Sequence, residues 1–298
     1  MVINLKKILI SLLSIGAVAV VAVFATQAFF SDTETSTGNT FVAGALDLQI
    51  DNESYAIDYN ILGFQDPVGD FVASTHTSWT LRDLTVEKYF DFVDLKPGDY
   101  GEDTISLHVE NNAWICAAAQ ITEDEDNDIT EPEDEVFGTN IDDDDGTADG
   151  DLDSDLQFAF WVDDGDNVYE SQEGGEGEPE VIFLSGPLSG LGSQGQITLA
   201  DSESSILGSN TPVPGGTTFY IGKAWCYGTM TDSELAQDGA NTGTPLTLGT
   251  GFDCDGSVPG NIGQTDSVVG DLEFYAEQSR NNDEFVCSGW TPSWGLPD

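Results

Sequence analysis

The clearest indication of the fold is the stretch Ile105-Ser106-Leu107-His108-Val109-Glu110, residues 105–110, where apolar and polar side chains alternate strictly. An alternation with a period of two places every apolar side chain on one face of an extended chain, so the pattern predicts a half-buried β-strand. The same alternation recurs in residues 46–51 and 272–277. We therefore expect strands of this kind in widely separated parts of the chain.

Further strands are expected where β-branched and aromatic residues gather, at residues 156–162, 181–184, 197–200 and 217–225. Turn residues separate these segments. In Lys96-Pro97-Gly98-Asp99 the proline sets φ and the glycine accepts a positive φ, as a type II turn requires. Many short strands separated by Gly, Pro and Asp predict an all-β fold, an antiparallel β sandwich or jelly roll.

Helical signals are weak and short, at residues 87–92 and 233–237. Two long loops are expected. Residues 123–155 are dominated by Asp and Glu, and residues 241–264 are rich in Gly, Thr and Asn. Residues 41–298 are thus predicted to form a single β domain that carries these two loops.

The N-terminus has the pattern of a secretion signal. Lys6 and Lys7 precede an uncharged apolar run, residues 8–23, and small residues follow up to Ala28. A run this short, with basic residues before it and acidic ones after it, predicts a signal peptide over residues 1–28, cleaved between Ala28 and Phe29. The alternative is an uncleaved N-terminal anchor. Cleavage predicts a secreted protein with no stable membrane span in its mature form.

The charge balance is strongly acidic, with 55 Asp and Glu against 7 Lys and Arg, a formal net charge of −48. Loss of residues 1–28 removes two basic residues and no acidic one, which makes the charge −50. Such a surface repels polyanions, which excludes ordinary binding of nucleic acid and disfavours docking on anionic lipid. It favours divalent cations or high salt in the working environment, and the sequence does not separate these two settings.

Four cysteines occur, and an even number in an exported chain predicts two disulfides. Three connectivities are possible. We favour Cys116–Cys226 and Cys254–Cys287. A metal site made of the four is not expected, because no two of them have CxxC spacing.

Two blocks of sequence resemble the TasA/camelysin family. The first runs from Phe30-Ser31-Asp32-Thr33-Glu34-Thr35 through residues 38–48, and the second is residues 95–99 followed by residues 105–111. Residues 124–298 lie outside the resemblance. It implies an exported subunit of a surface filament or biofilm matrix, processed by a dedicated signal peptidase, with a jelly-roll fold. It further implies a head-to-tail homopolymer that assembles by donor-strand complementation.

In such a polymer the mature N-terminal segment, here residues 29–40, adds as a strand to the sheet of the next subunit. Residues 29–39 suit this role, since they hold several threonines, no proline and a flexible glycine, Gly38. The alternative is a linker or first strand of a monomeric secreted calcium-binding or adhesion module. The predicted donor residues are Phe29, Phe30, Ser31, Thr33, Thr35 and Thr37.

Carboxylates in two acidic loops predict calcium binding. Residues 124–128 have carboxylates at alternate positions, although Ile129 stands where an EF-hand needs Gly. Residues 163–170 follow a predicted strand, so their carboxylates could converge at its end. The alternative is a solvated acidic face. The candidate Ca²⁺ ligands are Asp124, Asp126, Asp128, Glu135, Asp163, Asp164, Asp166 and Glu170.

The camelysin resemblance also raises a metallopeptidase as an alternative. The two histidines, His76 and His108, form no HExxH motif, and His108 shares a strand face with Glu110 alone. No GxSxG motif occurs either, and we expect no catalytic residue. The sequence therefore predicts a non-enzymatic structural subunit of an extracellular filament, with Ca²⁺ as its candidate cofactor.

Overall fold

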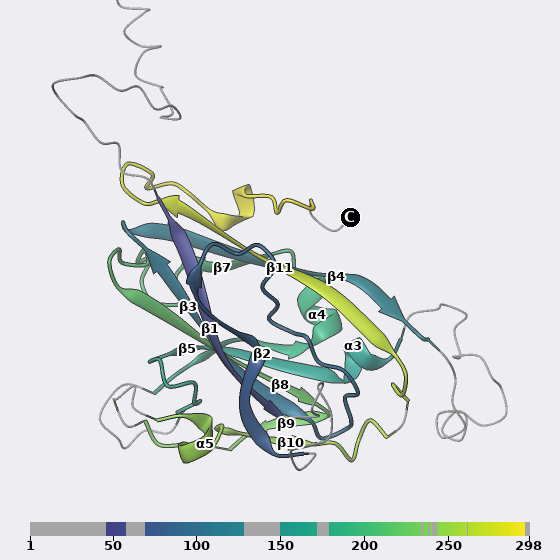
Figure 1. The fold of residues 1–298 in the computed structure, drawn as a ribbon. Helices are drawn as coiled ribbons and strands as arrows, with labels where there is room; N and C mark the ends of the chain where they lie inside the picture. The colour runs from purple at the N-terminus through teal and green to yellow at the C-terminus, as the bar shows by residue number, and fades with distance from the viewer. Residues whose placement is uncertain are drawn as a thin grey trace, which may run out of the picture. The chain divides into compact units, whose positions relative to one another are not determined.

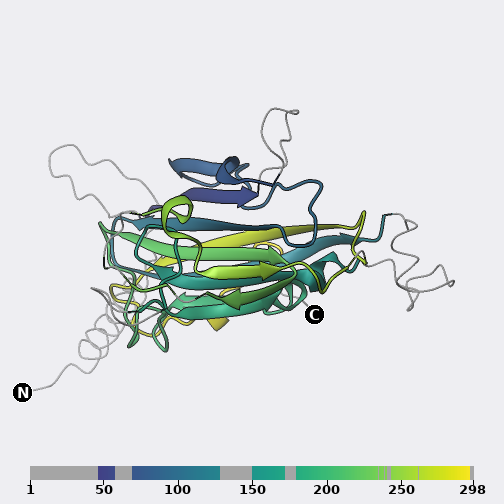
Figure 2. The same ribbon diagram turned by 90° about the horizontal axis from the view of Figure 1, so that it is seen from below.

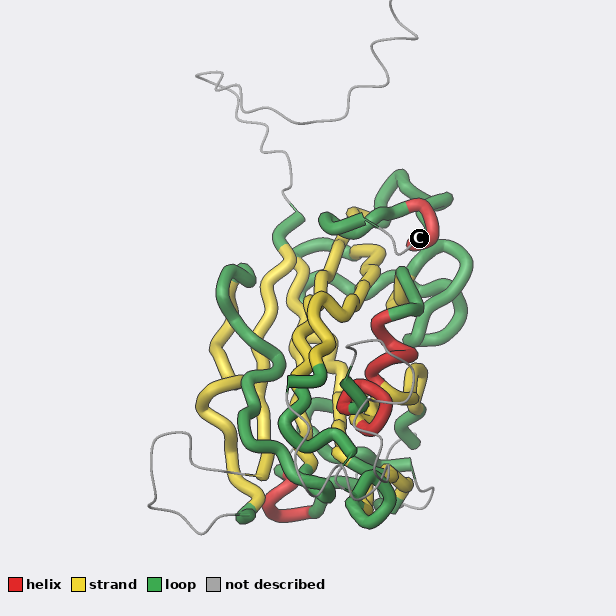
Figure 3. The backbone as a smooth tube through the Cα atoms, turned by 90° about the vertical axis from the view of Figure 1, so that its right-hand side faces the viewer, coloured by secondary structure: helices red, strands yellow, loops and turns green. Residues whose placement is uncertain are grey.

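The computed structural model describes residues 46–57, 69–127, 150–171 and 179–295, apart from 234, 238, 240–242 and 261. All of these lie in one compact unit that begins at Leu46. Strands dominate it and the helices are short (Figure 3), so the predicted all-β fold is confirmed. The predicted signal peptide and donor segment, including Ala28 and Phe29, lie outside the described residues, as do Asp128 and Glu135.

The larger sheet has six antiparallel strands in the order β2-β1-β3-β8-β5-β6 (Figures 1 and 2). Its central strands, β3 and β8, come from distant parts of the sequence. Such pairing brings together side chains that lie far apart in the sequence. The strands are β1 (Leu48–Ile57), β2 (Phe71–Arg82), β3 (Tyr100–Val109), β5 (Leu156–Asp163), β6 (Ile182–Pro187) and β8 (Thr218–Tyr227).

A second sheet has three antiparallel strands in the order β11-β4-β7, and β9 and β10 form a small third sheet. The remaining strands are β4 (Ala113–Glu125), β7 (Gln196–Ala200), β9 (Thr229–Asp232), β10 (Phe252–Asp255) and β11 (Ser267–Gln278). The helices are α3 (Leu152–Asp155), α4 (Leu188–Gly192), α5 (Pro245–Leu248) and the 3₁₀ turn η1 (Cys287–Gly289). None of the helices in the described residues is long and apolar enough to cross a membrane.

The main core lies between the six-stranded and three-stranded sheets. Ile105 and Leu107 of β3 pack in one buried cluster with Ile115 of β4 and Phe274 of β11. The apolar face predicted for residues 105–110 is therefore confirmed. The polar face is not solvated as expected, because Ser106 is buried as well. The six-stranded sheet is thus covered on both faces near its centre.

All seven predicted strands are found, and so is the turn at residues 96–99. There the Asp99 amide donates to the Lys96 carbonyl at 2.9 Å, and Gly98 has a φ of 97°. The weak helical signals at residues 87–92 and 233–237 do not correspond to helices, since no helix occurs at the described positions of either range.

The predicted loops are also shorter than expected. β4 extends to Glu125 and α3 occupies Leu152–Asp155, so both ends of residues 123–155 are regular structure. Residues 241–264 contain α5 and β10. In each case pairing or packing with distant segments orders residues that have loop-like composition.

The cysteines form two disulfides, as predicted, but the preferred pairing is wrong. The bonds are Cys116–Cys287 and Cys226–Cys254. Cys116 lies opposite Tyr275, whose ring stacks on Trp290 of the C-terminal segment. Cys226 lies on the opposite layer, on the face of β8 that carries Ala224 and looks away from the main core. The whole sandwich separates Cys116 from Cys226, so they cannot bond.

Candidate functional site

Two neighbouring residues of β3, Glu102 and Asp103, place carboxylates on opposite faces of the six-stranded sheet. Side chains alternate along a strand, so successive residues point to opposite sides. Asp103 lies opposite Lys223 and two residues from the core residue Ile105. Glu102 lies opposite Ala224, which packs in a different cluster under β10. We call these two sides the core face and the outer face.

The outer face holds a group of buried carboxylates, which we call the outer-face group. It comprises Glu102 of β3, Asp163 at the end of β5, Asp166 in the following loop, and Glu180 before β6. Each is less than one tenth exposed, and Glu102 is 1% exposed. No ion pair in the described part of the chain reaches any of them.

Asp163 and Glu180 hold the loop between β5 and residue 170 in place. Asp163 accepts hydrogen bonds from the Thr104 hydroxyl at 3.0 Å, the Trp161 indole at 3.2 Å and the Asn167 amide at 3.3 Å. Glu180 accepts from the amides of Asp164 and Glu170, both at 3.0 Å. Gly222 lies beneath Trp161, where a Cβ would collide with the indole. This local packing fixes the positions of both carboxylates.

Other oxygens of the same region have no hydrogen-bond partner. They are both carboxylate oxygens of Glu102, the Oδ2 atom of Asp166 and the Oδ1 atom of Asn167. A buried acceptor without a donor costs free energy, and native proteins keep few of them. Four such oxygens close to one loop therefore require an explanation.

The pKa values of Asp166 and Glu180 are raised to about 8 and about 9. Burial is the larger cause, and repulsion between neighbouring carboxylates adds to it. Burial raises the pKa of Asp163 to about 7, although its hydrogen bonds oppose the shift. The pKa of Glu102 rises well above its ordinary value for the same two reasons, burial first. The group therefore needs either protons or a cation to neutralise it.

Carboxylate and amide oxygens are the ligands that Ca²⁺ prefers. The residues present thus have the right chemistry for a hard cation. Among the described residues, however, no three His, Cys, Asp or Glu side chains are already arranged as a metal site.

The structure brings together only part of the predicted calcium set. Asp163 and Asp166 belong to the outer-face group, and Asp164 and Glu170 lie in the loop that Glu180 holds. Glu102 and Glu180 were missed. Glu102 lies far away in sequence on a strand that pairs with β8, and no local spacing marks it.

Asp124 and Asp126 lie elsewhere, at the end of β4. Asp126 and Asp151 are near Asp266, whose pKa burial raises to about 6. The Asp266 carboxylate accepts from the Asp151 amide at 2.7 Å. These residues are only partly buried, but the Oδ1 atoms of Asp126 and Asp266 are themselves buried without a hydrogen-bond partner, as the oxygens of Glu102 are. The structure therefore separates the two predicted calcium loops.

His108 pairs with Asp51 across β1 and β3, at 2.9 Å between Nε2 and Oδ2. His108 therefore has a carboxylate partner on the neighbouring strand, and it does not form a pair of metal ligands with Glu110.

On the core face, the Lys223 ammonium and the Asp103 carboxylate are in direct contact, and both side chains are fully buried. Asp103 Oδ1 accepts from the Ser54 hydroxyl at 2.9 Å, and Thr77 donates to Ser54 at 2.8 Å. Burial raises the pKa of Asp103 and lowers that of Lys223, while each opposes the shift of the other. This pair was missed in the sequence analysis. A lysine inside the apolar strand predicted at residues 217–225 could have indicated a buried charge with a carboxylate partner.

A scan of protein-family models and a search of curated proteins find no match to this chain. The resemblance to the TasA/camelysin family therefore stays a prediction. The assignment of a function rests on the residues and on their arrangement.

Proposed function

We propose that the protein is a secreted structural subunit of an extracellular filament or biofilm matrix. Residues 29–39 of one copy would add as a strand to a sheet of the next copy, in a head-to-tail polymer. The observation that carries this proposal is the edge strand β11. The described residues pair it with β4 alone, on one side. An open strand edge of this length is a template for pairing with another chain.

The segment beside this edge is apolar. Residues 83–99 connect β2 to β3 and run along β11, since Tyr89 contacts Phe274 with ring centroids 6.1 Å apart and Phe92 packs in one cluster with Val268 (Figure 1). Val86 is 84% exposed and Val93 is 53% exposed. A donor strand with Phe29 and Phe30 would cover apolar surface that water now contacts.

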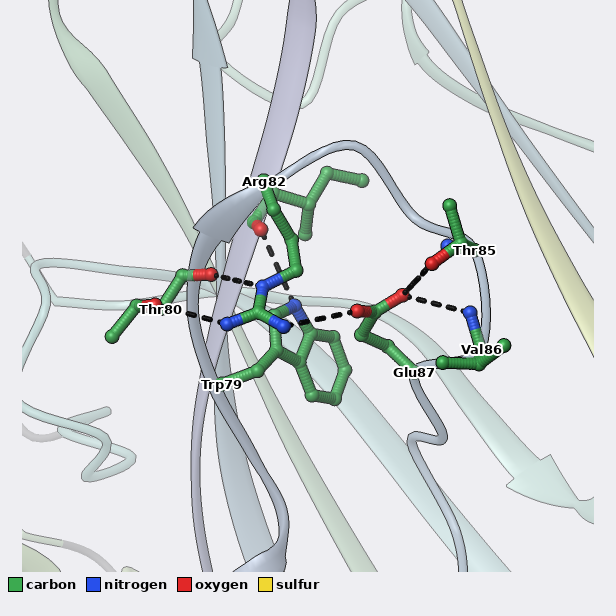
Figure 4. Close-up of polar contacts among 7 residues, drawn as sticks. Trp79, Thr80, Arg82, Thr85, Val86 and Glu87 are labelled. Atoms are coloured by element: carbon green, nitrogen blue, oxygen red, sulfur yellow. Dashed lines mark hydrogen bonds and ion pairs between the residues drawn. The ribbon is translucent and has the colours of Figure 1, made fainter.

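The start of this connection is held firmly (Figure 4). Glu87 accepts hydrogen bonds from the amides of Thr85 and Val86 at 2.6 and 2.9 Å, and Arg82 contacts its other oxygen at 3.3 Å. These backbone hydrogen bonds lower the pKa of Glu87 to about 2. Glu87 is therefore charged at ordinary pH and can accept these hydrogen bonds.

The disulfides also support the proposal. Two disulfides form in oxidising surroundings, which fits export. A head-to-tail strand exchange generates a fibre when successive copies do not close into a ring.

Electron microscopy of the mature chain, residues 29–298, tests the proposal. We expect filaments from this chain and folded monomers from a chain that starts at Thr40. Val269→Lys places a charge on the 46% exposed edge residue of β11 and should abolish filaments. Val258→Lys, at an exposed loop residue, is the matched control and should not. Monomers from the mature chain in all conditions would contradict the proposal.

Calcium binding at the outer-face group is a second candidate function, favoured by the two unpartnered oxygens of buried Glu102. A cation there would neutralise carboxylates and give these oxygens a partner. Isothermal titration with CaCl₂ should show binding to the wild type that Glu102→Gln weakens at least tenfold. Glu110→Gln, at an exposed position on the turn after β3, should bind as the wild type does. Equal affinity in all three proteins would overturn this assignment.

A further inference from the structure

The core-face pair, Lys223 and Asp103, differs from the other lysine–carboxylate pairs of the described residues. Lys88–Asp91 and Lys96–Asp94 lie on the surface, where water solvates both partners. Lys223 and Asp103 are both completely excluded from solvent. Removing two charges from water is costly, and mutual attraction offsets this cost only when the surroundings satisfy the remaining donors and acceptors.

The surroundings of the Lys223 ammonium are aromatic, whereas the Asp103 carboxylate is hydrogen-bonded by the buried polar side chains of Ser54 and Asn52. The Lys223 nitrogen lies 3.7 Å from the centre of the Phe90 ring and 5.7 Å from that of Tyr89. Its strand neighbour across the sheet on the other side is Phe160 of β5. Such a site excludes water, which both destabilises the charged forms and removes the solvent that would hydrolyse a bond formed there.

The two groups are also held in place for reaction. Lys223 of β8 and Asp103 of β3 are directly opposite in the antiparallel register, so the central strands of the sheet fix both backbones. Groups held in contact in this way react with the advantage of a very high effective concentration.

We propose that the Lys223 amine and the Asp103 carboxyl condense to an intramolecular isopeptide bond between β8 and β3. The neutral amine attacks Cγ of the protonated carboxyl, so that the Nζ–Cγ bond forms and the Cγ–Oδ2 bond breaks. Oδ2 departs as water, with its own hydrogen and one from the amine. The second amine hydrogen stays on the amide nitrogen. Nothing is oxidised or reduced, and no co-reactant is needed.

The product would satisfy its hydrogen bonds in the present structure. Ser54 already donates to Oδ1, which becomes the amide oxygen, and this contact polarises the carbonyl during attack. Lys223 Nζ already donates to the Tyr89 carbonyl at 3.3 Å, and the remaining amide N–H can keep that bond. A neutral, fully hydrogen-bonded amide therefore replaces two buried charges. This inference does not depend on filament formation.

Mass spectrometry of the reduced, denatured protein tests the bond directly. We expect a mass lower than that of the sequence by one water molecule. Trypsin does not cleave the Lys96–Pro97 bond, so its sites in this region lie after Lys88, Lys223 and Arg280, and an acylated Lys223 is not a substrate. The bonded protein should therefore give residues 89–280 as one fragment that lacks one water. Loss of water at another aspartate would leave cleavage after Lys223 intact and would overturn the proposal.

Variants confirm the assignment. Lys223→Met and Asp103→Ala should each restore the full mass, whereas Lys88→Met, at a surface ion pair, should keep the loss of water. The wild-type measurement stands even if the core variants do not fold. A full-mass wild type that trypsin cleaves after Lys223 shows a buried ion pair and no bond.

Discussion

At the scale of single residues, Asp99 shows how burial couples the fold to pH. Its side chain is buried at the end of the turn before β3, and its carboxylate accepts from the Lys96 amide at 2.5 Å. Burial raises its pKa to about 6 from an ordinary value of 3.8, and the hydrogen bond only partly opposes the shift. Its contribution to stability is therefore complete below about pH 4 and is lost as the pH rises through 6.

We expect Asp99→Asn to remove this pH-dependent contribution. At pH 4 the wild type and the variant should have similar free energies of unfolding. As the pH rises to 7, the variant should become more stable than the wild type, by no more than about 3 kcal/mol. Urea unfolding at pH 4, 5, 6 and 7 measures the difference. Asp70→Asn, at an exposed position, is the control and should track the wild type. A constant difference between Asp99→Asn and the wild type would contradict the assignment.

At the scale of the elements, the Cys226–Cys254 disulfide ties β10 to β8 over the outer face. Phe252 of β10 packs against Trp161 and Tyr169, with ring centroids 5.5 and 4.8 Å apart. We expect Cys226→Ala/Cys254→Ala to lose about 2–4 kcal/mol of stability. It should also speed hydrogen exchange in residues 163–170, because that loop lies under the freed segment.

The matched control is Cys116→Ala/Cys287→Ala. It removes the other disulfide, which ties the C-terminal segment to β4 on the opposite layer. It should lower stability as well but leave exchange in residues 163–170 unchanged. The same exchange pattern in both variants would show that the loop does not depend on β10.

How far the sequence predicts these elements depends on how local their causes are. The strand at residues 105–110 was predictable because alternation is local. β2 was missed because its polar residues break the alternation at a sheet edge, and β4 because its first half is a continuous apolar run without alternation. β9 and β10 were missed because each has only four residues. The spacing of Asp163 and Asp166 in a loop after a predicted strand was enough to indicate that their carboxylates lie in one region. Glu102 and the Lys223–Asp103 pair were not predictable, since only the pairing of β3 with β8 creates them. The disulfide pairing failed for the same reason.

At the scale of the whole molecule, repulsion between carboxylates opposes folding. The chain has a formal net charge of −48, and few of its acidic residues can find a basic partner among 7 Lys and Arg. Surface repulsion acts over the Debye length, which falls from about 30 Å at 0.01 M salt to about 3 Å at 1 M. Screening should therefore stabilise the folded chain, whichever cation supplies it.

We expect the midpoint of thermal unfolding to rise steadily with NaCl over this range. CaCl₂ at the same ionic strength should raise it further if the outer-face group binds the cation. Glu102→Gln separates the two effects: it should keep the response to NaCl, which depends on total charge, and lose the additional response to CaCl₂, which depends on two unpartnered oxygens. A wild-type midpoint that does not change with NaCl would show that repulsion is not what limits stability.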